Sequence, residues 1–278
     1  ELLLLSLWQT AGESTWIDRY LLGKVRAWFS LEIASIGGRV GFYIWTRENL
    51  SKFIQSQIYA QYPGAEITVI NMEDDYTNLV DYPSSKYEMF GIEYKLTEPD
   101  PVPIKTYVDY GIDKVGDKEV TITDPITPVL EFLGSINEGE NLWIQILIRA
   151  HKKEDKDKKN WFKKTDYWKD EAKELIEKIR KESVTKTESK ENSFSYPNPT
   201  KGQMEKIYAI ERSVSKYGFD VGIRSVYIAE KERFNGMNIG GLIGAFKQYS
   251  SANLNGFGIG MTTSTDYPWE DKIGRAHV

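Results

Sequence analysis

The stretch WFSLEIASIGGRVGFYI, residues 28–44, decides the fold of this chain. Apolar side chains alternate with polar or small ones before and after a central Gly37-Gly38 pair. This alternation is typical of two half-buried strands, and paired glycines supply the backbone conformation that a tight turn between strands requires. The stretch therefore predicts a β-hairpin.

Helices and a strand around the hairpin complete a first unit, residues 1–91. An apolar run at residues 2–8 predicts a helix before the hairpin, and apolar residues at helical spacing over 46–62 predict another helix after it. Residues 65–70 then predict a strand. This order of elements fits a ferredoxin-like βαββαβ unit that lacks its first strand, which we expect upstream of Glu1.

A second α/β unit is predicted over residues 92–271. Its strands are expected at 92–96, 142–148 and 219–228, and its helices at 124–134, 200–218 and 238–246. A change in the phase of alternation between Ile223 and Val226 predicts a β-bulge. The expected fold class is therefore α/β of the α+β type, with two ferredoxin-like or split βαβ units whose antiparallel sheets are covered by helices.

A charged insertion interrupts the second unit at residues 152–199. Residues 152–191 hold 14 basic and 11 acidic side chains, so this segment carries +3 while the rest of the chain carries −8. Apolar residues at helical spacing over 168–179 predict a helix, and the composition of 183–199 predicts a flexible linker. Aromatic and lysine side chains mix here as they do in proteins that bind single-stranded nucleic acid, but the interspersed acids favour a solvated helix that docks on another chain.

Several chemistries have no support in the sequence. The chain has no cysteine and no P-loop motif, and its net charge of −5 gives no general reason to expect nucleic-acid binding. The Gly240–Gly244 segment lies in a predicted helix, where small residues for close helix packing explain it better than a dinucleotide site. The acids at 73–75 fit a solvated loop, and His151 fits an isolated surface histidine. We expect no catalytic residue, cofactor or metal.

Both ends of the sequence indicate a window on a longer protein. The chain begins at Glu1 without a methionine, and residues 272–278, KIGRAHV, resemble a translated sequencing adapter. We therefore set residues 272–278 aside as an artefact. The apolar run at the start is far shorter than a bilayer-spanning helix, so membrane anchoring is expected only through sequence that precedes Glu1.

Four motifs carry a resemblance to a known family. They are WFSLEI at 28–33, QIYAQYP at 57–63, WIQI at 143–146 and NIGGLIGAFKQ at 238–248. Together they are similar to an uncharacterised bacterial domain family from genomes of uncultivated candidate phyla, over about residues 1–269. Domains of that family resemble the regions that precede the motor in type IV secretion and conjugation ATPases, and the family defines no catalytic residues.

The resemblance implies a non-catalytic assembly module at the cytoplasmic face of the cell membrane. Its protein partner would be a secretion-type motor or a membrane assembly. The alternative is a nucleic-acid-handling module that uses the lysines and aromatic residues of 152–169. The residues expected at the interaction surface are Trp161, Phe162, Lys163, Lys164, Trp168, Gly240, Gly244 and Lys247.

Overall fold

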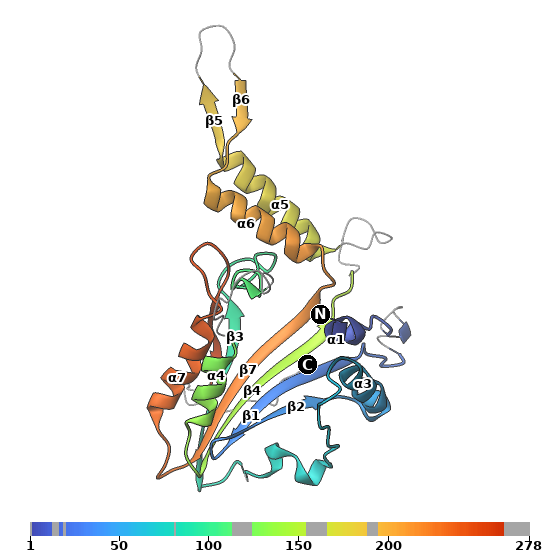
Figure 1. Ribbon diagram of the computed structural model, residues 1–278, viewed down its shortest axis with the longest axis vertical. Coiled ribbons are helices and arrows are strands. Elements are labelled where there is room, and N and C mark those ends of the chain that lie inside the picture. The colour runs from blue at the N-terminus through green and yellow to red at the C-terminus, as the bar shows by residue number, and fades with distance from the viewer. Residues whose placement is uncertain are drawn as a thin grey trace.

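The fold is built on one six-stranded antiparallel sheet, seen in a computed structural model (Figure 1). The structure describes residues 2–12, 17–18, 21–80, 82–112, 124–153, 166–187 and 194–263. In sheet order the strands are β2 (Arg39–Trp45), β1 (Trp28–Ile36), β4 (Glu140–Ala150), β7 (Phe219–Glu230), β3 (Tyr87–Leu96) and β8 (Phe257–Thr262). The predicted α+β class with antiparallel strands is confirmed.

Helices cover one face of this sheet. The α-helices are α1 (Leu2–Leu7), α3 (Glu48–Gln61), α4 (Thr127–Gly134), α5 (Tyr167–Glu182), α6 (Lys201–Val214) and α7 (Gly236–Lys247). Helices α1 and α3 pack at one end of the face, where Phe29 pairs with Ile148, and α4 and α7 pack at the other end, over Leu142 and Ile144. Burial of these aliphatic and aromatic side chains is the main force that holds the helices on the sheet.

The opposite face is covered at one end by two short 3-10 turns, η1 (Met72–Asp74) and η2 (Tyr76–Asn78). Tyr76 and Val80 pack there on Ala34, Trp143 and Ile228. At this end of the sheet, the central strands β4 and β7 are therefore buried on both faces. This double burial explains the change of phase in β7, because Val226 and Ile228 face the turns rather than the helices.

The bulge predicted between Ile223 and Val226 is wrong. Strand β7 pairs with β4 without a shift of register from Phe219 to Ala229. A register shift lies instead between β3 and β8, beside Ile92 and Tyr94. The apolar residues at consecutive positions of β7 are explained by burial of both faces of the strand, not by an extra residue in it.

The predicted hairpin is confirmed by the pairing of β1 with β2. Gly37 and Gly38 form its turn with φ values of +56° and +83°. A Cβ atom on Gly38 would lie 2.7 Å from the carbonyl oxygen of Ile136. Glycine is needed at this position both for its backbone conformation and for the close approach of the loop that follows α4.

The strand predicted at residues 65–70 is wrong. These residues form an irregular connection from α3 to η1, and Val69 and Ile70 are exposed. Strand β1 pairs with β2 on one side and with β4 on the other, from Trp28 to Ile36. Because each strand has only two sides, the segment at 65–70 has no place beside β1 in the ladder.

The strands of the two predicted units, 1–91 and 92–271, lie in one sheet rather than two. Strand β1 of the first segment pairs with β4 of the second, and the boundary between residues 91 and 92 falls inside β3. The strand order β2-β1-β4-β7-β3-β8 is that of a single continuous sheet.

An arm projects from one end of the sheet (Figure 1). It consists of the antiparallel helices α5 and α6 and, at their far end, the ribbon of β5 (Val184–Thr187) and β6 (Phe194–Pro197). The helix predicted inside the charged insertion is confirmed as α5. The linker predicted at 183–199 is wrong for the described parts of that segment, which pair as β5 and β6.

The arm has its own small apolar core, in which Val102 from the loop after β3 is fully buried. The other buried members are Ala172, Ile176, Ile179, Ile207 and Ile210. Within the described ranges, no helix is both long enough and apolar enough to cross a bilayer.

Candidate functional site

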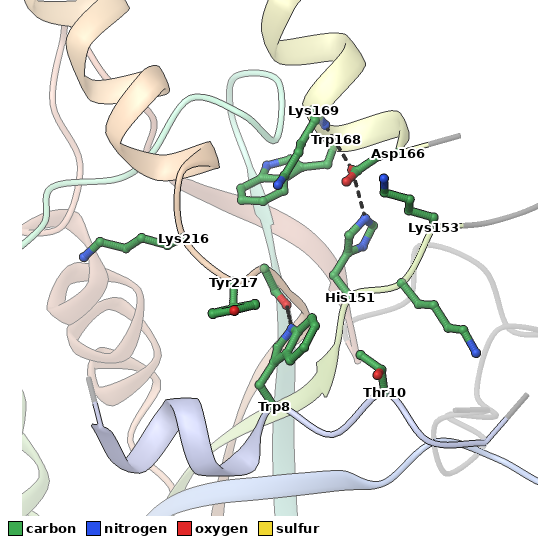
Figure 2. A pocket seen from close by; sticks show the side chains of 11 residues that line it. Trp8, Thr10, His151, Lys153, Asp166, Trp168, Lys169, Lys216 and Tyr217 are labelled. Carbon is green, nitrogen blue, oxygen red and sulfur yellow. Dashed lines mark hydrogen bonds and ion pairs between the residues drawn. The ribbon is translucent and has the colours of Figure 1, made fainter. Parts of the chain in front are cut away.

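A pocket of about 360 Å³ lies where the arm meets the sheet (Figure 2). We call it the junction pocket and define it by Trp8, His151, Asp166, Trp168 and Tyr217 together with Lys152, Lys153, Lys169 and Lys216. The lining comes from the end of α1, the end of β4, the start of α5 and the turn between α6 and β7. In the view of Figure 2, Trp168 lies above and Trp8 below, with His151 on one side and Tyr217 on the other.

Glycine at position 218 lets the walls of the pocket approach one another. A Cβ atom there would lie 3.0 Å from Cζ3 of Trp168 and 3.3 Å from Cβ of His151. The carbonyl oxygen of Gly218 accepts a hydrogen bond of 3.0 Å from Nε1 of Trp8. Gly218 therefore joins the aromatic residues that come from α1 and α5.

His151 lies between two aspartates at the bottom of the arm. Its Nδ1 is 2.8 Å from Oδ1 of Asp220, and its Nε2 is 3.4 Å from Oδ1 of Asp166. The imidazole is about one quarter exposed. The interpretation of His151 as an isolated surface histidine is therefore wrong, because β4 and β7 end side by side and bring Asp220 to it.

Asp220 is surrounded by cationic side chains. Its Oδ2 lies 3.1 Å from Nη2 of Arg149 and 3.7 Å from Nη1 of Arg26. Arg26 is only 2% exposed and donates a hydrogen bond of 2.7 Å to the carbonyl oxygen of Ala150. The negative charge of Asp220 is thus balanced within the fold, as a partly buried carboxylate requires.

Asp166 has a structural role as the N-cap of α5. Its Oδ1 accepts a hydrogen bond of 3.2 Å from the backbone N–H of Lys169, which satisfies one of the free donors of the first helical turn. Two other lysines of the pocket also contact the fold. Nζ of Lys152 donates to the carbonyl oxygen of Gly12, and Nζ of Lys216 lies 5.1 Å from the ring centre of Tyr107.

The aromatic walls contact one another at the edges of the pocket. The rings of Trp8 and Tyr217 have centroids 4.4 Å apart at an angle of 47°. The rings of His151 and Trp168 are 6.1 Å apart in an edge-to-face arrangement. The result is a hollow with rigid aromatic surfaces and lysines around it, a combination that favours a planar or anionic ligand over a cation.

The residues predicted for an interaction surface lie in two separate regions. Trp168 lines the junction pocket, while Trp161, Phe162, Lys163 and Lys164 lie outside the described residues. Gly240, Gly244 and Lys247 lie on the exposed side of α7. The buried side of this helix packs on α4. The structure therefore does not bring the α7 residues to Trp168.

Only one glycine of the predicted packing segment is used for helix packing. A Cβ atom on Gly241 would lie 2.3 Å from Cε2 of Phe132 on α4, whereas Cβ atoms on Gly240 and Gly244 would meet open space. The interpretation of Gly240–Gly244 as a packing segment is thus confirmed at Gly241 alone.

A hydrogen-bonded chain crosses the opposite face of the sheet. The Tyr76 hydroxyl donates to Oε2 of Glu32 at 2.5 Å and accepts from Nε2 of Gln145 at 2.7 Å. Nε of Arg224 donates to Oε1 of Gln145 at 2.7 Å. Burial raises the pKa of Tyr76, and the bond to Glu32 raises it further, so the hydroxyl stays protonated. This network fastens η2 to the sheet.

The acidic residues next to this network behave as predicted. Glu73 and Asp74 are exposed, and Asp75 caps η2 by accepting a 2.8 Å hydrogen bond from the backbone N–H of Thr77. Within the part of the chain that the structure describes, no group of three or more metal-ligating side chains is positioned to hold an ion.

Sequence reasoning missed most of the junction pocket. Trp8, Lys216 and Tyr217 carry no short-range signal, because they meet only through the packing of α1 and the α6–β7 turn. The sequence offered one sign of the site. His151 follows the predicted strand at 142–148, and Asp220 lies at the start of the predicted strand at 219–228. Their contact depends on the pairing of β4 with β7, which the sequence pattern does not specify.

The fold and the pocket define an α+β domain with a helical arm and an aromatic, lysine-rich hollow at the base of that arm. The chain belongs to the family described as a domain of unknown function, DUF8128, which matches residues 19–272. Neither the curated proteins nor the solved structures contain a match to this chain.

Proposed function

We propose that this chain is a non-catalytic assembly module of a membrane-associated system of the type IV secretion or conjugation kind. In this role it would hold a protein partner, such as a secretion-type motor, at the cytoplasmic face of the membrane. The sequence resemblance suggests the kind of system. The surface of the first 25 residues is the observation that carries the proposal.

Large apolar side chains are exposed at several of the described positions of this N-terminal stretch, and we call them together the N-terminal apolar surface. Its members are Leu2, Leu4, Leu5, Ile17, Leu21, Leu22 and Val25, with exposed fractions between 42% and 67%. In α1 only Leu7 is buried. Single exposed leucines are ordinary, but a concentration of them in one stretch is typical of surfaces that another molecule covers.

The arm supports the same role. Helices α5 and α6 extend away from the sheet (Figure 1) and contact the body through Val102, the junction pocket and ion pairs of α6 with Glu98 and Asp109. Their outer surfaces carry mixed charges, with ion pairs such as Arg180 to Glu211 at 3.5 Å. A projecting helical hairpin presents a large contact surface, and mixed charges favour specificity for one partner.

Co-isolation from cells that carry the intact gene tests this proposal. The intact protein, its L21S/L22S variant and a V221S control are each isolated after cross-linking in the cell; Val221 is as exposed as Leu22, at 54% and 58%. We expect a protein with a P-loop motif or membrane-spanning segments to accompany the wild type and V221S but not L21S/L22S. Equal recovery from all three proteins, or recovery of no such protein from any, contradicts the proposal.

A second candidate function is the handling of single-stranded nucleic acid through residues 152–169. The observation that favours it is the junction pocket, where the described ends of this segment bring lysines and Trp168 together. Binding of an oligonucleotide that weakens steeply with salt would support it. The net charge of −5 counts against a large phosphate-binding surface.

A further inference from the structure

Two other buried polar clusters are fully used by the fold. The Glu140 carboxylate accepts hydrogen bonds from the Tyr227 hydroxyl and from Nδ2 of Asn238, which fixes the start of α7. Asn255 bonds the loop after β3 through both ends of its amide. The junction pocket differs, because its aromatic faces and lysines surround a hollow instead of filling it.

The charged side chains around the pocket give it a net attraction for anions. Asp220 is balanced by Arg26 and Arg149, and Asp166 caps α5. Among the lining residues, Lys153 and Lys169 therefore face one aspartate, Asp166. In a chain whose net charge is −5, such a local excess of positive charge creates a field that favours a negatively charged ligand.

Lys153 and Lys169 are the two lysines best placed to meet a ligand. Both are exposed, and within the described ranges neither ammonium group has a carboxylate within 4.0 Å. They stand near the two ends of the segment 152–169, on the side of the pocket where Asp166 and Trp168 lie (Figure 2).

The aromatic walls add a second preference. Three aromatic residues and one carboxylate could form a cage for a quaternary ammonium group, but four surrounding lysines oppose a cation. A planar ring can stack on an indole face without regard to its own substituents. The volume of about 360 Å³ is at the small end of the range for ligand pockets, roughly 300–1,000 Å³, so the ligand must be small.

We propose that the junction pocket binds a nucleotide unit, with its base against Trp168 and its phosphate between Lys153 and Lys169. A free mononucleotide and one unit of a single strand present the same base and phosphate, so either can be the source. This inference does not depend on the proposed assembly function. It adds a defined binding site to the second candidate function, the handling of single-stranded nucleic acid.

Calorimetric titration of the whole chain tests the proposal with four probes. They are uridine monophosphate, uridine, ribose 5-phosphate and an oligothymidylate. We expect saturable binding of the mononucleotide or the oligonucleotide, and about tenfold weaker binding of uridine and of ribose 5-phosphate, each of which keeps only one of the two recognised groups. Tighter binding of the oligonucleotide than of the mononucleotide identifies a strand as the source, and equal affinity per site identifies the free nucleotide.

A matched pair of variants assigns the binding to the pocket. The K153Q/K169Q variant removes two ammonium groups but keeps the backbone donor that caps α5, and we expect about tenfold weaker binding. The K173Q/K178Q control removes two exposed lysines further along the same helix and is expected to bind as the wild type does. Unfolding midpoints of both variants should match the wild type.

Three results overturn the proposal. The first is the absence of saturable binding of both the mononucleotide and the oligonucleotide. The second is equal binding by K153Q/K169Q and K173Q/K178Q. The third is binding of ribose 5-phosphate as tight as that of uridine monophosphate, because the site would then recognise an anion without a base.

Discussion

Substitution of Asn255 by alanine should destabilise the fold more than any other change at a polar side chain in its loop. Asn255 is fully buried between β8 and the loop that follows β3. Its Oδ1 accepts from the backbone N–H groups of Thr97, Glu98 and Gly256, at 3.0, 2.8 and 2.9 Å. Its Nδ2 donates to the carbonyl oxygens of Glu98 and Val102, both at 3.0 Å.

The magnitude follows from the groups left without partners. The N–H of Thr97 also bonds the carbonyl oxygen of Gly256, so it keeps a partner, whereas the N–H groups of Glu98 and Gly256 lose theirs. A buried donor without a partner costs about 1–3 kcal/mol, and the Glu98 N–H is only partly buried, so N255A should cost about 3 kcal/mol. At about 2–4 °C per kcal/mol for a chain of this size, the melting temperature should fall by about 10 °C.

The control is N253A, which removes the same amide two residues away from an exposed position. We expect N253A to change the free energy of unfolding by less than about 0.5 kcal/mol. Urea unfolding followed by circular dichroism measures both variants. A loss of less than about 1 kcal/mol in N255A, or equal losses in the two variants, refutes the reasoning.

Three further predictions test other parts of the fold. Burial acts to raise the pKa of Glu140, but hydrogen bonds from Tyr227, Asn137 and Asn238 outweigh it and lower the pKa. The carboxylate therefore stabilises the fold above its unfolded pKa of about 4.3, and this stability is lost as the pH falls through the folded pKa; acid unfolding of E140Q should depend less on pH. G241A should destabilise because its Cβ meets Phe132 at 2.3 Å, whereas G240A, in open space on the same helix, should stabilise by about 0.5–1 kcal/mol in thermal unfolding. G38A should cost about 2 kcal/mol or more in urea unfolding, and clearly more than G23A, which has a positive φ but no neighbour within 4 Å.

The predictions that were confirmed rest on local patterns in the sequence. The hairpin at residues 28–45 follows from alternation and paired glycines, and α5 follows from apolar spacing. In α5 one face is buried and the other is exposed, so the period of the apolar residues reports the backbone conformation directly.

Predictions failed where distant parts of the chain compete for the same place. The apolar residues at 65–70 fit a strand, but β4 already occupies the free side of β1. In β7, Val226 and Ile228 suggested a bulge because their burial under η2 was not visible in the sequence. The pairing of strands is decided by tertiary packing, which overrides a local pattern of this strength.

The candidate site was the least predictable part. Trp168 was among the expected interaction residues, but Trp8 and Tyr217 reach the same pocket from segments about 160 and 50 residues away in the chain. Such a site depends on where α1 and α6 end against the sheet, and no short motif encodes that position.

Site-specific photocross-linking at Leu22 tests the central claim most directly. A photoreactive residue is placed at Leu22 or, as a control of similar exposure, at Val221 in the intact protein within cells that carry the intact gene. The assembly function predicts a discrete cross-link from Leu22 to a motor protein or a membrane protein, and none from Val221. Cross-linking from Leu22 that is absent, or no more specific than that from Val221, contradicts the claim that the N-terminal apolar surface is where the partner binds.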